Sequence, residues 1–70
     1  MQVKLEPGVK FEFYVREGVC HDQIYWAEVL SDSVTVEWRD EFGAYKSVNY
    51  ATWDAESCIR QGLWEVINEF

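Results

Sequence analysis

The sequence predicts an α+β fold: a mainly antiparallel β-sheet or a partly open barrel, with one short C-terminal helix and a closing strand. Apolar and polar residues alternate repeatedly between positions 9 and 50, as in strands with one buried face. The spacing then changes to the i, i+3, i+4 pattern of a helix at Ala55, Cys58 and Ile59. With 70 residues, the chain is long enough for a single domain, 1–70.

Turn-forming residues divide the alternating part into strands. The expected strands are Val9–Arg16, Ile24–Leu30, Val34–Arg39 and Ala44–Tyr50, and after the helix Leu63–Ile67. In the first strand Phe11 and Phe13 should face inward, and in the third Val34, Val36 and Trp38. The second strand carries large apolar groups on both faces, so we expect it to be central or covered on both sides.

The helix is expected at Trp53–Gln61. Thr52 is the expected N-cap, and the acidic residues Asp54 and Glu56 suit the first turn, where the helix dipole favours negative charge. Gly62 suits the residue that follows a helix, because that residue often needs a positive φ.

The charge balance restricts the class of partner. Six lysines and arginines stand against 13 aspartates and glutamates, for a net charge of −7. Such a chain repels phosphate backbones and anionic membranes, which argues against direct nucleic-acid binding and favours a partner protein with a basic surface. No apolar run approaches the roughly 18 residues of a membrane span, and no signal peptide is visible. We therefore expect a cytoplasmic protein.

No pattern in the sequence indicates catalysis. The neighbours Cys20 and His21 lack the further ligands of a zinc site, and His21 has no evident serine and acid partners. Cys58 lies on the apolar side of the helix and is expected to be a small buried hydrophobe. A disulfide between Cys20 and Cys58 is an alternative. We expect no enzyme activity, no catalytic residue, no metal site and no cofactor.

Acidic residues gather between positions 22 and 41, where six stand against Arg39 alone. They are Asp22, Glu28, Asp32, Glu37, Asp40 and Glu41. Neighbours on one face of a strand are about 6.6 Å apart, which is of the order of the phosphate spacing in nucleic acids. Such a face would suit a basic groove; the alternative is a solvated surface that keeps a small protein in solution.

Aromatic residues supply candidate anchors. The chain has four Trp, four Tyr and four Phe, and a core of this size needs about half of them. Tyr14, on the polar side of the first strand, and Phe42, at a hairpin tip beside two acids, are the expected outward rings. The alternative is that Phe42 folds back over the sheet. The predicted partner-binding residues are Glu28, Asp32, Glu37, Asp40, Glu41, Phe42 and Tyr14.

Part of the chain resembles the Tudor pattern. Tyr25–Val29 supplies an aromatic residue followed by Ala-x-Val, and Val34–Gly43 an alternating strand followed by Asp-x-x-Gly. The resemblance implies a small SH3-like, Tudor-like barrel and an aromatic cage for methylated lysine or arginine. The positions that would form the cage are Trp26, Trp38, Phe42 and Tyr45.

The C-terminal half resembles small acidic proteins of bacteriophages. It has a meander containing Val-x-Val-x-Trp at Val34–Trp38, then a helix, then Gly-x-Trp and two aliphatic residues at Gly62–Ile67. This resemblance implies a viral protein, in the cytoplasm of an infected bacterium, that binds and blocks a host enzyme. Some proteins of this kind act by imitating DNA.

These observations lead to one leading hypothesis and two alternatives. The leading hypothesis is a phage-type inhibitor, or DNA mimic, that docks on a basic surface of a host nucleic-acid-handling protein. The first alternative is a Tudor-like reader of methylated lysine or arginine. The second is a structural or scaffold subunit, a homo-oligomer that associates through Trp53, Trp64 and Phe70.

Overall fold

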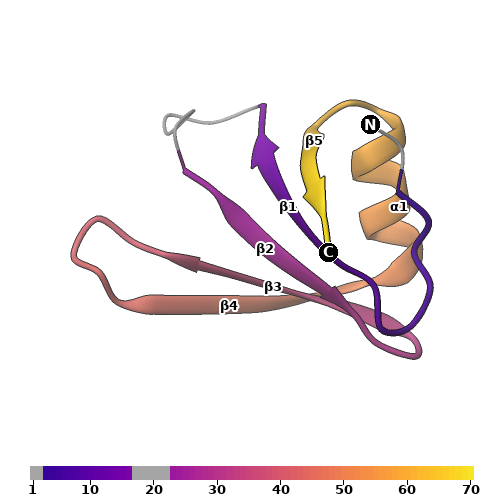
Figure 1. Cartoon of the computed structure of the whole chain (residues 1–70), viewed down its shortest axis with the longest axis horizontal. Helices are drawn as coiled ribbons and strands as arrows, with labels where there is room; N and C mark the ends of the chain where they lie inside the picture. Colours follow the sequence, from indigo (N-terminus) through magenta and orange to yellow (C-terminus); the bar gives the residue numbers. More distant parts are fainter. Residues whose placement is uncertain (1–2, 17–22) are drawn as a thin grey trace.

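A computed structural model describes residues 3–16 and 23–70 of the chain (Figure 1). Five strands and one helix follow in the order β1 (Lys10–Val15), β2 (Tyr25–Val29), β3 (Ser33–Arg39), β4 (Tyr45–Ala51), α1 (Thr52–Arg60) and β5 (Trp64–Glu69). The strands form one antiparallel sheet in the order β4-β3-β2-β1-β5. The predicted α+β class and the predicted order of elements are confirmed.

The sheet is open: of the two predicted architectures the antiparallel sheet is confirmed, and it is not closed into an SH3-like or Tudor-like barrel. β4 and β5 lie at opposite edges of the sheet, and within the described part of the chain no pairing joins them. A barrel would need these edges to meet. Instead, the helix connects β4 to β5 and packs across one face of the sheet, so the space that a barrel would enclose is filled by α1.

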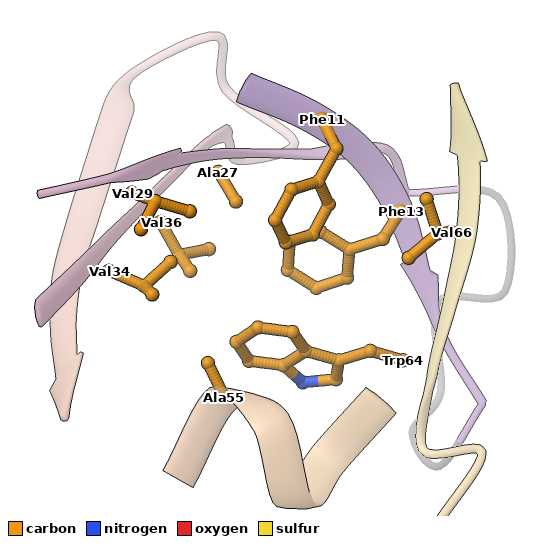
Figure 2. Close-up of a cluster of buried hydrophobic side chains, with 9 residues drawn as sticks. All are labelled: Phe11, Phe13, Ala27, Val29, Val34, Val36, Ala55, Trp64 and Val66. Atoms are coloured by element: carbon orange, nitrogen blue, oxygen red, sulfur yellow. The ribbon is translucent and has the colours of Figure 1, made fainter. Parts of the chain in front are cut away.

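The core lies between α1 and one face of the sheet, here called the inner face (Figure 2). Its buried members are Phe11, Phe13, Ala27, Val29, Val34, Val36, Trp64 and Val66 from the strands and Ala55 from the helix. The ring of Phe13 stacks on Trp64, with 4.3 Å between centroids. The inward orientation predicted from the alternation is confirmed for Phe11, Phe13, Val34 and Val36.

The helix begins without the predicted cap. Thr52 is already the first helical residue, and Ala51 holds the N-cap position in an extended conformation with no side-chain cap bond. The reason is that β4 runs directly into α1, which leaves no turn residue between them. At the other end, the amides of Gly62 and Leu63 donate to the carbonyls of Ile59 and Cys58 at 3.1 and 2.9 Å. With φ of 79°, Gly62 completes the predicted helix stop.

β2 is the central strand, as expected, but the described residues cover only one of its faces. Ala27 and Val29 are buried against the core, whereas Glu28 is exposed and Trp26 is 39% exposed. Of the two alternatives predicted for this strand, the central position is therefore the one confirmed, since the chain's one described helix packs on the inner face. The opposite side of the sheet, here called the outer face, is therefore the surface where candidate binding residues can gather.

Candidate functional site

One row of side chains crosses the outer face at right angles to the strands. The strand registers place side by side, from one edge to the other, Asn68, Glu12, Trp26, Glu37 and Ser47. Adjacent strands lie about 4.8 Å apart, so the carboxylate-bearing residues Glu12 and Glu37 flank Trp26 on either side. The central strand thus presents an aromatic ring between two acids.

The ring of Trp26 is held by its neighbours in this row. Its Nε1 donates a hydrogen bond to Oε2 of Glu12 at 3.1 Å, and Nδ2 of Asn68 donates to Oε1 of the same carboxylate at 3.1 Å. Asn68 therefore holds the carboxylate of Glu12, and this carboxylate in turn orients the indole of Trp26. No sequence pattern indicates a role for Glu12 or Asn68, because these residues are 56 positions apart and meet only through the pairing of β1 with β5.

A shallow hollow of about 210 Å³ lies on the outer face beside Trp26. Glu28, Glu37 and Phe70 are among the side chains that line it. Glu28 lies opposite Thr35 and Glu37 opposite Trp26, so the two glutamates are diagonal neighbours, about 7–8 Å apart by the geometry of antiparallel sheets. Both are exposed, and within the described residues neither forms an ion pair. Their negative charges are therefore available to a partner.

The basic residues of the outer face leave this hollow acidic. Among the described residues that line the hollow, Lys10, opposite Glu28, is the one basic residue. The guanidinium of Arg39 lies 4.5 Å from the ring centroid of Tyr45 and donates a hydrogen bond to its hydroxyl at 3.0 Å. Arg39 thus interacts with an aromatic ring of its own hairpin, and in the part of the chain that the structure describes it forms no ion pair with Glu28 or Glu37.

The tip of the β3–β4 hairpin is built around Asp40. Its Oδ1 accepts hydrogen bonds from the amides of Phe42 and Ala44, both at 2.9 Å, and its Oδ2 lies 3.9 Å from Nζ of Lys46. This is an Asx-type turn, so the carboxylate of Asp40 has a structural role. Phe42 is 87% exposed, which shows that its ring does not fold back over the sheet.

The structure separates the predicted partner-binding residues into three places. Glu28 and Glu37 share the outer face, and Tyr14 lies on it in β1, half-buried and opposite Glu65. The second place is the hairpin tip of Asp40, Glu41 and Phe42. The third is the β2–β3 turn, which holds Asp32 at the other end of β3, about 20 Å from the tip for a strand of this length.

The aromatic residues of the Tudor-like cage are not brought together. Trp26 lies on the outer face and Trp38 on the inner face, where its ring packs 5.3 Å from that of Tyr25. Phe42 is at the hairpin tip, and the face of Tyr45 is already occupied by the guanidinium of Arg39. The four rings therefore do not surround one space.

Of the residues considered for a disulfide or a metal site, Cys58 lies within the described part of the chain. Cys20, His21 and Asp22 lie outside the described residues. Cys58 is a free, half-buried thiol packed against the core. Its pKa is raised mainly because burial disfavours the thiolate, and to a smaller extent because Asp54 is negatively charged. Among residues 3–16 and 23–70, no three potential metal ligands lie together.

The outer face is thus the part of the described chain where aromatic and charged side chains gather. No described helix has both the length and the apolar character needed to cross a membrane. No protein-family model, no curated protein and no solved structure matches this chain.

Proposed function

We propose that this chain is a small acidic protein-binding module that docks through its outer face on a basic surface of another protein. The observation that supports the proposal is the row in which Trp26 lies between Glu12 and Glu37, beside the hollow that Glu28 also lines. An aromatic side chain at the centre of a patch supplies contact area, and the surrounding carboxylates supply complementarity to a basic surface.

The energetic roles of these residues differ. Trp26 is 39% exposed and is oriented by Glu12, so little side-chain entropy remains to be lost when a partner covers the ring. Glu28 and Glu37 have no ion-pair partner among the described residues, so they attract a basic partner at a distance and increase the association rate. The proposed interface therefore has an oriented aromatic anchor and acidic residues that steer association.

The partner class that we propose is a nucleic-acid-handling protein of a bacterial host, bound by a phage-type inhibitor. Such a protein has a basic groove, and the net charge of −7 favours association with it. The spacing of about 7–8 Å between Glu28 and Glu37 is of the order of the distance between phosphates, which favours the DNA-mimic form of the proposal.

The two alternatives have less support. The cage for a methylated side chain would need Trp26 and Trp38 on one face, and they lie on opposite faces. The scaffold surface was expected to include Trp64, but this residue is 6% exposed because it faces α1 from the inner face. Trp53 and Phe70 are exposed, but they do not complete the expected surface without Trp64.

The test compares two double charge reversals. Glu28→Lys with Glu37→Lys changes the outer face, and Glu6→Lys with Glu56→Lys changes the net charge equally at exposed positions away from it. Basic proteins retained from nuclease-treated bacterial lysate by the wild-type chain are purified, and association rates are measured across a range of salt concentrations. We expect the first double variant to slow association at least about tenfold at low salt, because complementary charges steer encounter.

The outcomes are interpreted by comparing the two double variants and by adding duplex DNA as a competitor. Equal slowing by both double variants would show that only net charge matters and would refute docking through the outer face. Unchanged rates in both would refute an electrostatic interface altogether. In the DNA-mimic form, duplex DNA should compete with the chain for the same partner, and simultaneous binding of both would contradict that form alone. Circular dichroism of each variant checks that the fold is kept.

A further inference from the structure

The free edge of β4 is a second surface of the sheet that can bind a partner, through backbone hydrogen-bonding groups that no described strand pairs with. β4 has seven residues, and within the described part of the chain its only strand neighbour is β3. It contains no proline, and its pairing with β3 shows no register shift. Positions 45 to 49 are all exposed, and the β3–β4 hairpin extends well beyond α1 (Figure 1). Long, straight, exposed edges of this kind pair with a further strand.

The hairpin geometry shows which backbone groups face outward. The amide of Asp40 donates to the carbonyl of Ala44 at 3.0 Å, so these two residues form a hydrogen-bonded pair. Hydrogen-bonded and non-hydrogen-bonded pairs alternate along an antiparallel ladder, so the backbone groups of Lys46, Val48 and Tyr50 face β3. Those of the intervening residues, Tyr45, Ser47, Asn49 and Ala51, therefore point away from the sheet, toward the free edge.

We propose that two copies of this chain associate by antiparallel pairing of their β4 strands, centred on Val48. In this register Val48 lies opposite the same residue of the second copy. Ser47 then lies opposite Asn49, Lys46 opposite Tyr50, and Tyr45 opposite Ala51 of the second copy. The outward backbone groups of Ser47 and Asn49 form a hydrogen-bonded pair with their counterparts, and inner-face residues meet inner-face residues.

The side chains of β4 are self-complementary in this register. Val48 is 39% exposed, and the two copies of it would meet as a non-hydrogen-bonded pair, in which side chains lie closest. The ammonium of Lys46 would lie beside the ring of Tyr50 across the new pair, an arrangement that favours a cation–π contact. Ser47 and Asn49 would add a polar pair on the outer face.

Charge selects β4 rather than the other edge for self-association. The segment YKSVNYA contains one lysine and no acid, although the chain as a whole has a net charge of −7. Two copies can therefore meet along β4 without bringing carboxylates of the two strands together. The opposite edge strand, β5, carries Glu65 and Glu69. If two β5 strands paired in an antiparallel way, the glutamates of one copy would lie near those of the other and repel them.

The resulting dimer would be one continuous ten-stranded sheet with both helices on the same side. Both outer faces would then lie together on the opposite side, so the dimer would present two copies of the acidic patch around Trp26 to a partner. The pairing involves Ser47, at the β4 end of the outer-face row, but not Glu12, Trp26, Glu28 or Glu37, so the dimer and the proposed docking on a basic protein can fail independently.

The first test measures molar mass against protein concentration by light scattering after gel filtration. We expect a concentration-dependent shift from 8.3 kDa toward twice that mass. Ser47→Pro removes an outward amide that does not bond to β3, so the monomer should still fold. It should raise the dissociation constant at least about tenfold, because the dyad loses two hydrogen bonds. A monomer at every concentration, or dimerisation unaffected by a folded Ser47→Pro variant, would overturn the proposal.

A second variant and a cross-link keep the test independent of Ser47→Pro. Val48→Lys places like charges opposite each other and should also abolish the dimer. In a background of Cys20→Ser and Cys58→Ala, Val48→Cys should form an intermolecular disulfide on mild oxidation, because the pair brings the two Cα atoms to about 4.5 Å. Asn49→Cys is the matched control: its two copies are not opposite each other. Cross-linking of Asn49→Cys as fast as Val48→Cys would refute the register.

Discussion

Replacement of Asp40 should destabilise the fold by loosening the β3–β4 hairpin. In Asp40→Ala the amides of Phe42 and Ala44 lose the acceptor that both reach at 2.9 Å. The ion pair with Lys46 is lost as well, but at 3.9 Å and with the lysine side chain 53% exposed it contributes little. The two hydrogen bonds therefore determine the effect.

The magnitude follows from the exposure of these groups. A typical hydrogen bond contributes about 0.5–1.5 kcal/mol net, and the carboxylate here is one-quarter exposed, so water replaces part of what is lost. We expect Asp40→Ala to lower the free energy of unfolding by about 1–2 kcal/mol, out of about 4–10 kcal/mol for a domain of this length. Asp40→Asn keeps the Oδ1 acceptor and should lose less than half as much.

Urea unfolding followed by tryptophan fluorescence measures both variants against the wild type. Glu41→Ala is the matched control, because Glu41 is the exposed neighbour and forms no hydrogen bond or ion pair within the described residues. Stability of Asp40→Ala within about 0.3 kcal/mol of the wild type, or equal losses for Asp40→Ala and Asp40→Asn, would refute the structural role of this carboxylate.

Three further predictions concern the core. Phe13→Ala should lower the free energy of unfolding by about 3–5 kcal/mol, because the ring is fully buried and stacks on Trp64. If urea unfolding shows a smaller loss for Phe13→Ala than for Asp40→Ala, this packing is contradicted. In a Cys20→Ser background, Cys58 should react with iodoacetamide at pH 8 more slowly than a free thiol, since burial and Asp54 raise its pKa. Asp54→Asn should increase the reaction rate, because it removes one of these two causes. Because the pKa of Cys58 is higher in the folded state, the protonated thiol contributes to the free energy of unfolding. This contribution should be complete below the ordinary pKa of 9.0 and should be lost as the pH rises through the raised pKa of the folded state.

The elements were predictable because each is determined by local pattern. The alternation around Phe11 and Phe13 requires a strand with one buried face, and Gly62 supplies the positive φ at which the helix ends. The N-cap was not predictable in the same way. Thr52 has the right chemistry for a cap, but β4 continues to Ala51, so the tertiary path of the chain determined where the helix begins.

The candidate site was less predictable because it depends on pairing register. The acidic residues of the outer face could be read from the sequence, and Glu28 and Glu37 do share a face. Which aromatic ring lies between acids could not be read, since the row of Glu12 and Trp26 arises from strands that are separated along the chain. The open sheet has the same origin: a local pattern shared with small barrels does not say whether the edge strands meet.

The two faces of one sheet separate stability from binding in this molecule. Residues on the inner face pack against α1, so their substitution changes the free energy of unfolding. Within the described residues, Glu28 and Glu37 on the outer face form no ion pair and no side-chain hydrogen bond, so charge reversal there removes no such interaction from the fold. Glu12 is different, because its carboxylate orients Trp26. A loss of binding in the Glu28 and Glu37 variants therefore reports on the interface itself, whereas the same loss after substitution of Glu12 or Asp40 would mix binding with the positioning of an anchor or a turn.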